Sequence, residues 1–322
     1  DLQHKPKDFS FMKIEQYGAA VEVRKEESFS SLLDRYYEER DQIERMRVKS
    51  MDILKILSNR AERLSRKINN QRGEITKCDE KDDLRMKADL LNSSLYAVPK
   101  SVASVTLTNY YEENCPPIEI PLNPALSPSQ NAQKYYKDYR RAKTAEIKLA
   151  EQIAIAEEEL KYVDTNFYAL TEARTEQDLT EIRTELTEQG YIRPQKNQKS
   201  KKSAASKPLE FITADGFTVL VGRNNRQNDK LTLKDAGNND YWFHTKNIPG
   251  SHTVLLTEGK IPTDAAMEEA AVLAAKHSKA KDSTQVAVDY TKIRHVSKPQ
   301  GAKPGMVIYV NYKTLFVNPT KI

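Results

Sequence analysis

The sequence predicts an α+β multidomain protein. We expect a long antiparallel coiled coil that carries a small helix-plus-hairpin tip domain and is followed by a compact α+β domain. Three observations predict this: two stretches with a heptad-like apolar repeat, alternating apolar residues between them, and short strands with one helix in residues 209–322. With 322 residues, 38% of them hydrophobic and 30% charged, the chain is long enough for two or three domains.

The two apolar stretches predict the coiled coil. A repeat averaging 3.5 residues is typical of a helix that buries a narrow seam against another helix. Arms of about forty residues would reach roughly 60 Å. Two unrelated helices in one bundle remain the alternative. The later seam comprises Tyr135, Tyr139, Ala142, Glu146, Leu149, Ile153, Ala156, Leu160, Val163, Phe167 and Leu170; the earlier one comprises Leu54, Leu57, Ala61, Leu64 and Ile68, extended less cleanly through Met46 and Ile43 to Tyr36.

The arms should fold back on each other, because about sixty residues separate their seams. We expect Ile68 to lie near Tyr135, and Tyr36 near Leu170. The tip consists of a helix that Pro99 stops, and then a hairpin. The expected segments are 1–28, the remnant of an upstream domain with a last short strand; 29–78, the first arm; 79–127, the tip; 128–175, the second arm; 176–208, a helix and basic linker; and 209–322, the C-terminal domain.

Charge is distributed unevenly along the chain. Residues 191–322 contain 21 Lys and Arg against 11 Asp and Glu, a net of +10, whereas the whole chain carries +5. Residues 193–208 hold six basic and no acidic residues, which indicates a flexible basic linker. This linker is either a solvated tether or one that also lies along phosphates. The C-terminal part is therefore the candidate for contact with polyanions.

Two polar clusters in the C-terminal domain are the candidate binding residues. Residues 222–229, GRNNRQND, are rich in amide and guanidinium donors that suit phosphates and base edges. An Asn-rich turn satisfied by its own backbone is the alternative. Residues 240–252 hold the single tryptophan and two of the five histidines. Trp242 is either a base-stacking residue or a core residue, since alternation points it away from Tyr241 and Phe243.

The sequence offers no catalytic centre, metal site or cofactor site, so we expect a protein that is not an enzyme. His244, His252 and Asp289 fit no ligand spacing. Ser251 and His252 are adjacent and would point to opposite faces of a strand. The two cysteines do not form a disulfide framework. Without a signal peptide or a membrane-spanning apolar run, a cytoplasmic location is expected.

Several motifs resemble the NFACT family. The block at 222–229, the stretch WFHTKNIPGSH at 242–252, VDY at 288–290 and KPQGAKPG at 298–305 are similar to the family's C-terminal NFACT-R domain, and the paired arms resemble its coiled-coil and middle region. The resemblance implies nucleic-acid binding, with no catalytic and no metal-binding residue. The residues assigned to nucleic-acid binding are Arg223, Asn224, Asn225, Arg226, Gln227, Asn228, Trp242, His244, Lys246, Ser251, His252 and Lys303.

The family implies a function in ribosome quality control. Its members bind obstructed large ribosomal subunits and tRNA, and they support alanine tailing of stalled chains; contact with rRNA and the stalk base is implied. The alternative is an adhesin that binds host fibronectin or fibrinogen and is displayed at the surface without a signal peptide. A structural scaffold is a third class. Because the family's N-terminal domain is not intact in this sequence, we expect a C-terminal fragment that cannot tail chains alone.

Overall fold

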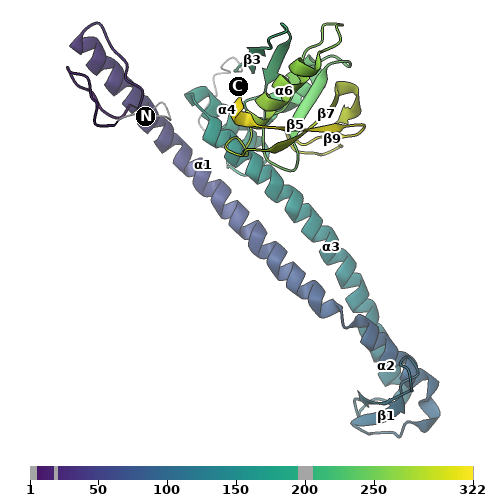
Figure 1. Ribbon diagram of the computed structural model, residues 1–322. Coiled ribbons are helices and arrows are strands. Elements are labelled where there is room, and N and C mark those ends of the chain that lie inside the picture. The colour runs from purple at the N-terminus through teal and green to yellow at the C-terminus, as the bar shows by residue number, and fades with distance from the viewer. Residues whose placement is uncertain (1–5, 18–20, 195–205, 322) are drawn as a thin grey trace. The chain divides into compact units, whose positions relative to one another are not determined.

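The computed structural model describes residues 6–17, 21–194 and 206–321, so most of the predicted basic linker lies outside the described residues. The chain divides into two compact units, Glu62–Leu160 and a second made of Asp1–Ala61 with Lys161–Ile322. Two helices run through both units, α1 (Phe29–Cys78) and α3 (Pro128–Glu172) (Figure 1). In the part of the chain that the structure describes, no helix is long and apolar enough to cross a membrane.

In the unit Glu62–Leu160, the end of α1 runs antiparallel to α3. The Gln71 side-chain amide donates to Gln152 Oε1 at 2.9 Å, and Arg72 Nη2 lies 2.6 Å from Glu157 Oε1. The predicted seam is present in this unit: the α3 positions Tyr135, Tyr139, Ala142, Glu146, Leu149 and Leu160 are half-buried, and five other residues at the three- and four-residue spacing are buried. These are Leu64, Ile68 and Gln71 of α1, and Ile153 and Ala156 of α3.

The expected register of this pairing was wrong. Ile68 was placed near Tyr135, yet Gln71 lies beside Gln152, more than four helical turns further along α3. The reason is the short helix α2 (Lys81–Ser93), which packs against the start of α3, where α1 was expected to pack. The Tyr136 hydroxyl donates to Asp89 Oδ1 of α2 at 2.5 Å. A repeat in the sequence fixes the apolar face of a helix but not its position along the partner.

The tip contains the predicted helix and hairpin. Strands β1 (Ser104–Thr108) and β2 (Pro117–Pro121) pair antiparallel, and the 3-10 turn Leu95–Ala97 leads into them from α2. Pro128 is the first residue of α3, and the Ser127 hydroxyl accepts from the Gln130 backbone N–H at 3.2 Å, as the sequence predicts. The core of the tip consists of Leu90, Leu91, Val98, Leu107, Ile120 and Ala132.

In the other unit, the start of α1 lies beside α4 (Glu176–Glu188). Lys49 Nζ lies 2.6 Å from Glu176 Oε2. Tyr36 is therefore well beyond the end of α3 and not near Leu170 as expected; its ring packs against Phe9 at a centroid distance of 4.8 Å. The short strand expected before α1 is absent from the described residues 6–17 and 21–28.

The C-terminal domain is a six-stranded antiparallel sheet in the order β10-β7-β5-β6-β4-β3, with α6 on one face (Figure 1). The predicted α+β class is confirmed. The strands are β3 (Leu209–Ile212), β4 (Thr218–Val221), β5 (Tyr241–Thr245), β6 (Thr253–Leu255), β7 (Val286–Lys292) and β10 (Lys313–Val317), and a separate pair is formed by β8 (Val296–Ser297) and β9 (Ile308–Tyr309). The helical segments are α5 (Asn225–Lys230), α6 (Asp264–Lys276), the π-helical turn Leu231–Asp235 and the 3-10 turns Ile293–His295 and Pro319–Lys321.

Strand β5 is buried on both faces of this sheet. Phe243 points into the core beneath α6, where alanines of α6 allow the helix to approach closely. Trp242 points to the opposite face and packs with Leu231, Val254, Ile293 and Val296. Because Trp242 is only 1% exposed, it is a core residue of this domain.

Candidate nucleic-acid interface

The predicted Arg/Asn block, residues 222–229, forms the turn after β4 and most of the short helix α5. Asn224 caps α5, since its side-chain oxygen accepts from the Gln227 backbone N–H at 2.9 Å. Asn228 Oδ1 accepts from the His252 backbone N–H at 3.1 Å. Gly222 is required beside it, because a Cβ at this position would lie 2.1 Å from Asn228 Oδ1. The block is thus folded against its own domain.

The same block is bonded to acidic side chains of α4. Arg223 Nη2 donates to Asp178 Oδ2 at 2.7 Å, and Asn224 Nδ2 donates to Glu181 Oε2 at 2.7 Å. Asn225 Nδ2 donates to Glu185 Oε1 at 3.0 Å. Burial raises the pKa of the Glu185 carboxyl above its ordinary value. We call this set the α4 latch: Asp178, Glu181, Glu185, Arg223, Asn224 and Asn225.

Two further predicted basic residues also face this region. Arg226 Nη1 lies 3.5 Å from Glu188 Oε1, and its side chain remains 46% exposed. Lys303 Nζ lies 4.7 Å from the ring centroid of Tyr162 and 4.6 Å from that of Tyr191. Lys303 also donates to the Tyr191 hydroxyl. Both cations therefore meet groups of their own chain at the α4 side of the domain.

The second predicted cluster lies mostly inside the domain. The rings of Trp242 and His244 are stacked at 5.7 Å with an interplanar angle of 8°. Thr232 Oγ1 and His252 Nδ1 lie 2.8 Å apart, and burial lowers the pKa of His252 to about 3. Lys246 is exposed at the end of β5, with its Nζ 3.9 Å from Asp289 Oδ1. Trp242 therefore offers no open face on which a base could stack.

The twelve predicted residues are thus distributed between the interior and the surface. Their contact with nucleic acid stays a prediction, and the contacts described above give most of them a structural role. Arg226 and Lys246 are exposed; Arg223, His244 and Lys303 are half-buried; and Asn224, Asn225, Gln227, Asn228, Trp242, Ser251 and His252 are buried.

Sequence reasoning missed a basic hollow beside the start of α6. The strand register places Tyr241 opposite Lys292 and Tyr290 opposite Lys313, so that two tyrosines and two lysines share one face of the sheet. Lys292 Nζ lies 5.6 Å from the ring centroid of Tyr241. The lining of this basic hollow consists of Tyr241, Pro262, Asp264, Met267, Tyr290, Thr291, Lys292, Arg294, His295, Asn311 and Lys313.

The basic hollow has the chemistry of a phosphate and base contact. Arg294 and Lys313 are exposed, and Lys292 is half-buried. Cationic side chains next to partly exposed aromatic rings suit nucleotides, which present phosphates and π-faces together. The signal in the sequence was weak, since Lys292 and Lys313 lie 21 residues apart and come together only through the pairing of β7 with β10.

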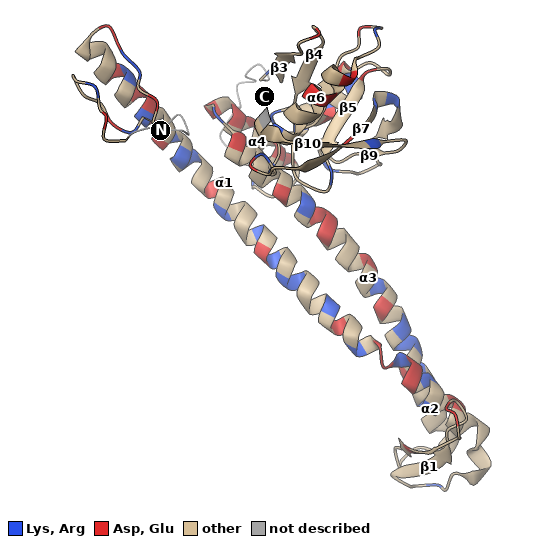
Figure 2. Cartoon of the chain, viewed as in Figure 1, with Lys and Arg blue, Asp and Glu red and all other residues tan. Residues whose placement is uncertain are grey.

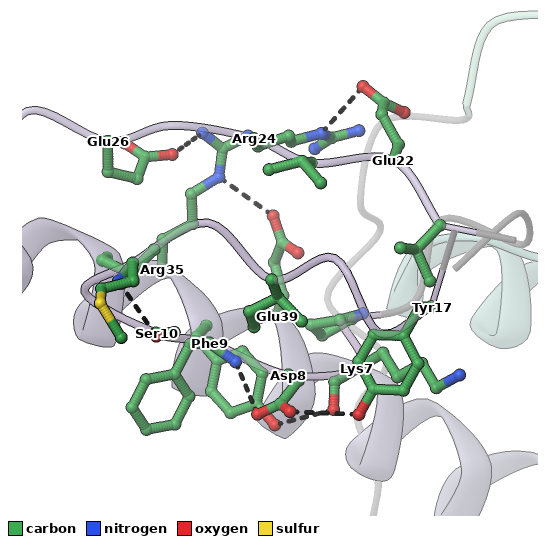
Figure 3. Close-up of a pocket in the computed structure, with 17 residues that line it drawn as sticks. Lys7, Asp8, Phe9, Ser10, Tyr17, Glu22, Arg24, Glu26, Arg35 and Glu39 are labelled. Carbon is green, nitrogen blue, oxygen red and sulfur yellow. Dashed lines mark hydrogen bonds and ion pairs between the residues drawn. The ribbon is translucent and has the colours of Figure 1, made fainter. Parts of the chain in front are cut away.

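Another hollow lies between residues 6–17 and 21–26 on one side and the start of α1 on the other (Figure 3). Arg35 projects between two carboxylates, with Nη1 2.5 Å from Glu26 Oε1 and Nε 3.1 Å from Glu39 Oε1. The Tyr17 hydroxyl donates to Asp8 Oδ2 at 3.1 Å. These charged groups are therefore already satisfied within the segment, and we assign no ligand to this hollow. Among the described residues, no group of three or more His, Cys, Asp or Glu side chains could hold a metal ion.

Two protein-family models match this chain, one over its N-terminal and middle part and one over its C-terminal domain. The model of the NFACT N-terminal and middle domains matches residues 2–205, which is more than half of the chain. The chain belongs to the NFACT family. The model of the NFACT protein RNA binding domain matches residues 207–311, which contain every strand of the sheet except β10, the Arg/Asn block and most of the basic hollow.

Relatives with similar sequences cover most of this NFACT chain. It is 40% identical over 311 residues to the Rqc2 homolog RqcH of Bacillus subtilis (strain 168), covering 96% of this chain and 54% of the relative. It is 39% identical over 296 residues to RqcH of Streptococcus suis (strain 05ZYH33), covering 92% of this chain and 52% of the relative. The chain therefore spans about half the length of these curated relatives.

A solved structure has the same fold. It is the C-terminal part of the fibronectin/fibrinogen-binding protein from Streptococcus suis, with a TM-score of 0.68 and 32% sequence identity. The similarity covers 86% of this chain and 96% of that chain. The fold of that structure is therefore similar to the fold of this chain over most of the length of both.

Proposed function

We propose that this NFACT chain acts in ribosome quality control as an RNA-binding module of the cytoplasm. The observation that carries the proposal is that the RNA-binding-domain match falls on the domain with the basic hollow. The relatives named RqcH, at 39–40% identity, support the quality-control role. Its partners would be the large ribosomal subunit and tRNA, and its contribution to alanine tailing would be positional and not catalytic.

The basic hollow is the part of the C-terminal domain that we propose contacts RNA directly. Lys292, Arg294 and Lys313 would neutralise phosphates, and the rings of Tyr241 and Tyr290 would pack against a base or ribose. The α4 latch would act indirectly by fixing the domain on α4, because its side chains are bonded to one another. Arg226 and Lys246, the two exposed residues of the predicted set, would add peripheral phosphate contacts.

Cosedimentation with purified large ribosomal subunits over a range of salt concentrations tests this proposal. A triple variant, Lys292→Gln/Arg294→Gln/Lys313→Gln, should bind more weakly. The slope of log K against log salt should become shallower by about 2, since three fewer counterions are displaced. The matched control is Lys230→Gln/Lys234→Gln/Lys279→Gln, which removes the same charge from exposed positions outside the hollow. If the two variants lose affinity equally, the loss is due to the lower net charge of the chain and not to the basic hollow.

Binding of fibronectin or fibrinogen is the second candidate. The observation that favours it is the similarity to the Streptococcus suis fibronectin/fibrinogen-binding protein. The same variants should be compared for capture of immobilised fibronectin and fibrinogen at physiological salt. Tight capture without any binding to ribosomal subunits would replace the quality-control proposal, whereas capture that disappears with rising salt would indicate only charge attraction.

A further inference from the structure

Strand β10 lies at one edge of the six-stranded sheet and pairs with β7 on its inner side. Among the described residues, no strand pairs with its outer side, and no backbone hydrogen bond from a turn or loop reaches residues 313–317. An edge strand directs the N–H and C=O groups of alternate residues away from the sheet. The outer side of β10 therefore presents an open row of main-chain donors and acceptors.

The edge of β10 has little of the protection that edge strands usually carry. Proteins commonly protect an edge with a short strand, several charges or a proline. Strand β10 has five residues without proline, and its one charged residue is Lys313, so that Figure 2 shows the rest of the strand in tan. The strand at the opposite edge, β3, has four residues, follows Pro208 directly and carries Glu210. The two edges of the sheet are therefore not equivalent.

The side chains of β10 divide between the two faces of the sheet. Leu315 and Val317 pack with the core beneath α6. Thr314 and Phe316 alternate with them and so point to the opposite face. The Thr314 hydroxyl donates to Asp289 Oδ1 at 2.6 Å, whereas the Phe316 ring is 67% exposed. A large apolar side chain thus lies directly beside the open row of main-chain groups.

The surroundings of β10 are basic. Residues 286–317 contain five Lys and Arg against one acidic residue, Asp289, which is only 1% exposed. Lys313 is exposed within β10, and Lys246 is exposed at the end of β5. Asp264 is the one acidic residue that lines the basic hollow next to Lys313. The charge around this edge therefore favours an acidic partner.

We propose that the outer edge of β10 is a docking site for an acidic peptide segment of a partner protein, which joins the sheet as an added strand. The open row contains donors and acceptors, so another strand satisfies both, whereas the phosphates of RNA offer acceptors only. Alternate residues of the peptide face opposite sides of the sheet. Apolar residues would pack on Phe316, and acidic residues would lie near Lys313. This protein contact goes beyond the proposed RNA binding and does not depend on it.

The test uses a synthetic eight-residue peptide of alternating valine and glutamate, with blocked ends and a fluorophore. It is titrated with the full chain and followed by fluorescence anisotropy. Two further peptides carry N-methyl groups on alternate residues, one on the valines and the other on the glutamates. Because only one of these sets of N–H groups faces β10, one methylated peptide should bind more than about tenfold more weakly, and the other within about twofold of the unmodified peptide. Equal affinities for the two methylated peptides overturn the proposed strand pairing.

Two alanine variants separate the β10 edge from general apolar exposure. Phe316→Ala should weaken peptide binding about tenfold, because the ring loses its apolar contact with the peptide. Ile212→Ala is the matched control, since Ile212 lies in the opposite edge strand β3 and is 72% exposed. Both positions are exposed, so circular dichroism should be unchanged in both variants. Equal losses of peptide affinity overturn the proposed site.

Binding to purified large-subunit ribosomal RNA provides a second readout for Phe316→Ala. This affinity should be unchanged, because Phe316 lies on the face of the sheet opposite the basic hollow. Weaker RNA binding with peptide binding intact overturns the proposal and assigns the surface to RNA. Failure of the RNA proposal alone leaves the peptide titration unaffected.

A second copy of the chain is the alternative occupant of this edge, with two β10 strands paired to each other. Sedimentation of the unmodified chain and of Phe316→Lys at increasing concentration distinguishes this case. A monomer whose β10 amide hydrogens exchange more slowly once the peptide is bound supports the proposal. A dimer that Phe316→Lys dissociates overturns it in favour of self-pairing, and slower exchange confined to β3 overturns it as well.

Discussion

Arg223 Nη2 lies 2.7 Å from Asp178 Oδ2, an oxygen that also accepts from the backbone N–H groups of Arg174 and Thr175. The carboxylate therefore closes the capping box of α4 and binds the turn before α5 at once. Asp178 is only 4% exposed, so these partners take the place of water as hydrogen-bond donors to its carboxylate. This ion pair explains why Arg223, which was predicted to contact RNA, instead points toward α4.

Replacing Arg223 with Ala should destabilise the C-terminal domain by about 2–3 kcal/mol, because a buried carboxylate loses its cation. The fluorescence of Trp242, the one tryptophan in the chain and a buried residue, reports unfolding of this domain. The control Arg226→Ala breaks a longer and more exposed pair with Glu188, and should cost less than about 1 kcal/mol. If the two variants unfold at similar urea concentrations, Arg223 does not stabilise the domain through its contact with Asp178.

Placing a charge in the helix seam should melt the arms. Ile153→Asp buries an unpaired carboxylate at a position that is 8% exposed, and should cost several kcal/mol. Ile155→Asp introduces the same change two residues away, at a position that is 67% exposed. Thermal melting followed by circular dichroism at 222 nm should show early helix loss only for the first. Leu160, a seam position chosen from the sequence, is half-buried and should be intermediate.

The C-terminal domain should lose stability in acid through His252. Its pKa falls from about 6.5 in the unfolded chain to about 3 in the fold, so protons bind the unfolded state preferentially between these values. The stability is fully present above pH 6.5 and declines as pH falls toward 3, by at most about 1.4 kcal/mol per pH unit for this group. In His252→Asn the decline of the urea midpoint between pH 7 and pH 5 should be smaller; an unchanged decline would assign it to other groups.

Two glycines should respond in opposite directions to the same substitution. Gly222→Ala places a Cβ 2.1 Å from Asn228 Oδ1 and so breaks the hydrogen bond that this oxygen accepts from the His252 backbone N–H, which should cost about 1–3 kcal/mol. Gly73→Ala meets nothing within 4 Å inside α1 and should stabilise that helix by about 0.5–1 kcal/mol. The first is measured by Trp242 fluorescence and the second by helix melting. Destabilisation by both would show that backbone freedom matters at Gly73.

The sequence predicted the elements well wherever a local pattern determined them. Pro128 begins α3 at the expected residue, and the apolar repeat marks the faces of Leu64 and Ile153 correctly. The prediction that Leu54 lies in the seam was wrong, because Leu54 is 37% exposed while its neighbour Ile53 is fully buried. N-terminal to Leu57, the buried residues of α1 no longer follow the predicted repeat. A single sequence does not show where along a helix its partner begins, so it does not show which part of the repeat will be buried.

The candidate site was harder to predict, because its partners are distant in the chain. Asp178 precedes Arg223 by 45 residues and Glu185 precedes Asn225 by 40, so nothing local shows that these polar groups will be buried together. Conversely, Lys292 and Lys313 are unremarkable in the sequence and become neighbours of Tyr241 and Tyr290 only through strand pairing. Residue type alone did not separate an internal polar contact from a binding surface.

The bond between Gln71 and Gln152 has a mechanical consequence for the helix pair. Gln71 is 9% exposed and occupies the seam between Ile68 and Ile75, where an apolar residue would fit the repeat. Sliding α1 by one heptad, about 10 Å, would separate the two amides and leave a buried polar group without its partner. The intermediate slips would also misalign the apolar residues on both sides. Within the unit Glu62–Leu160, the two helices are therefore held against sliding along each other.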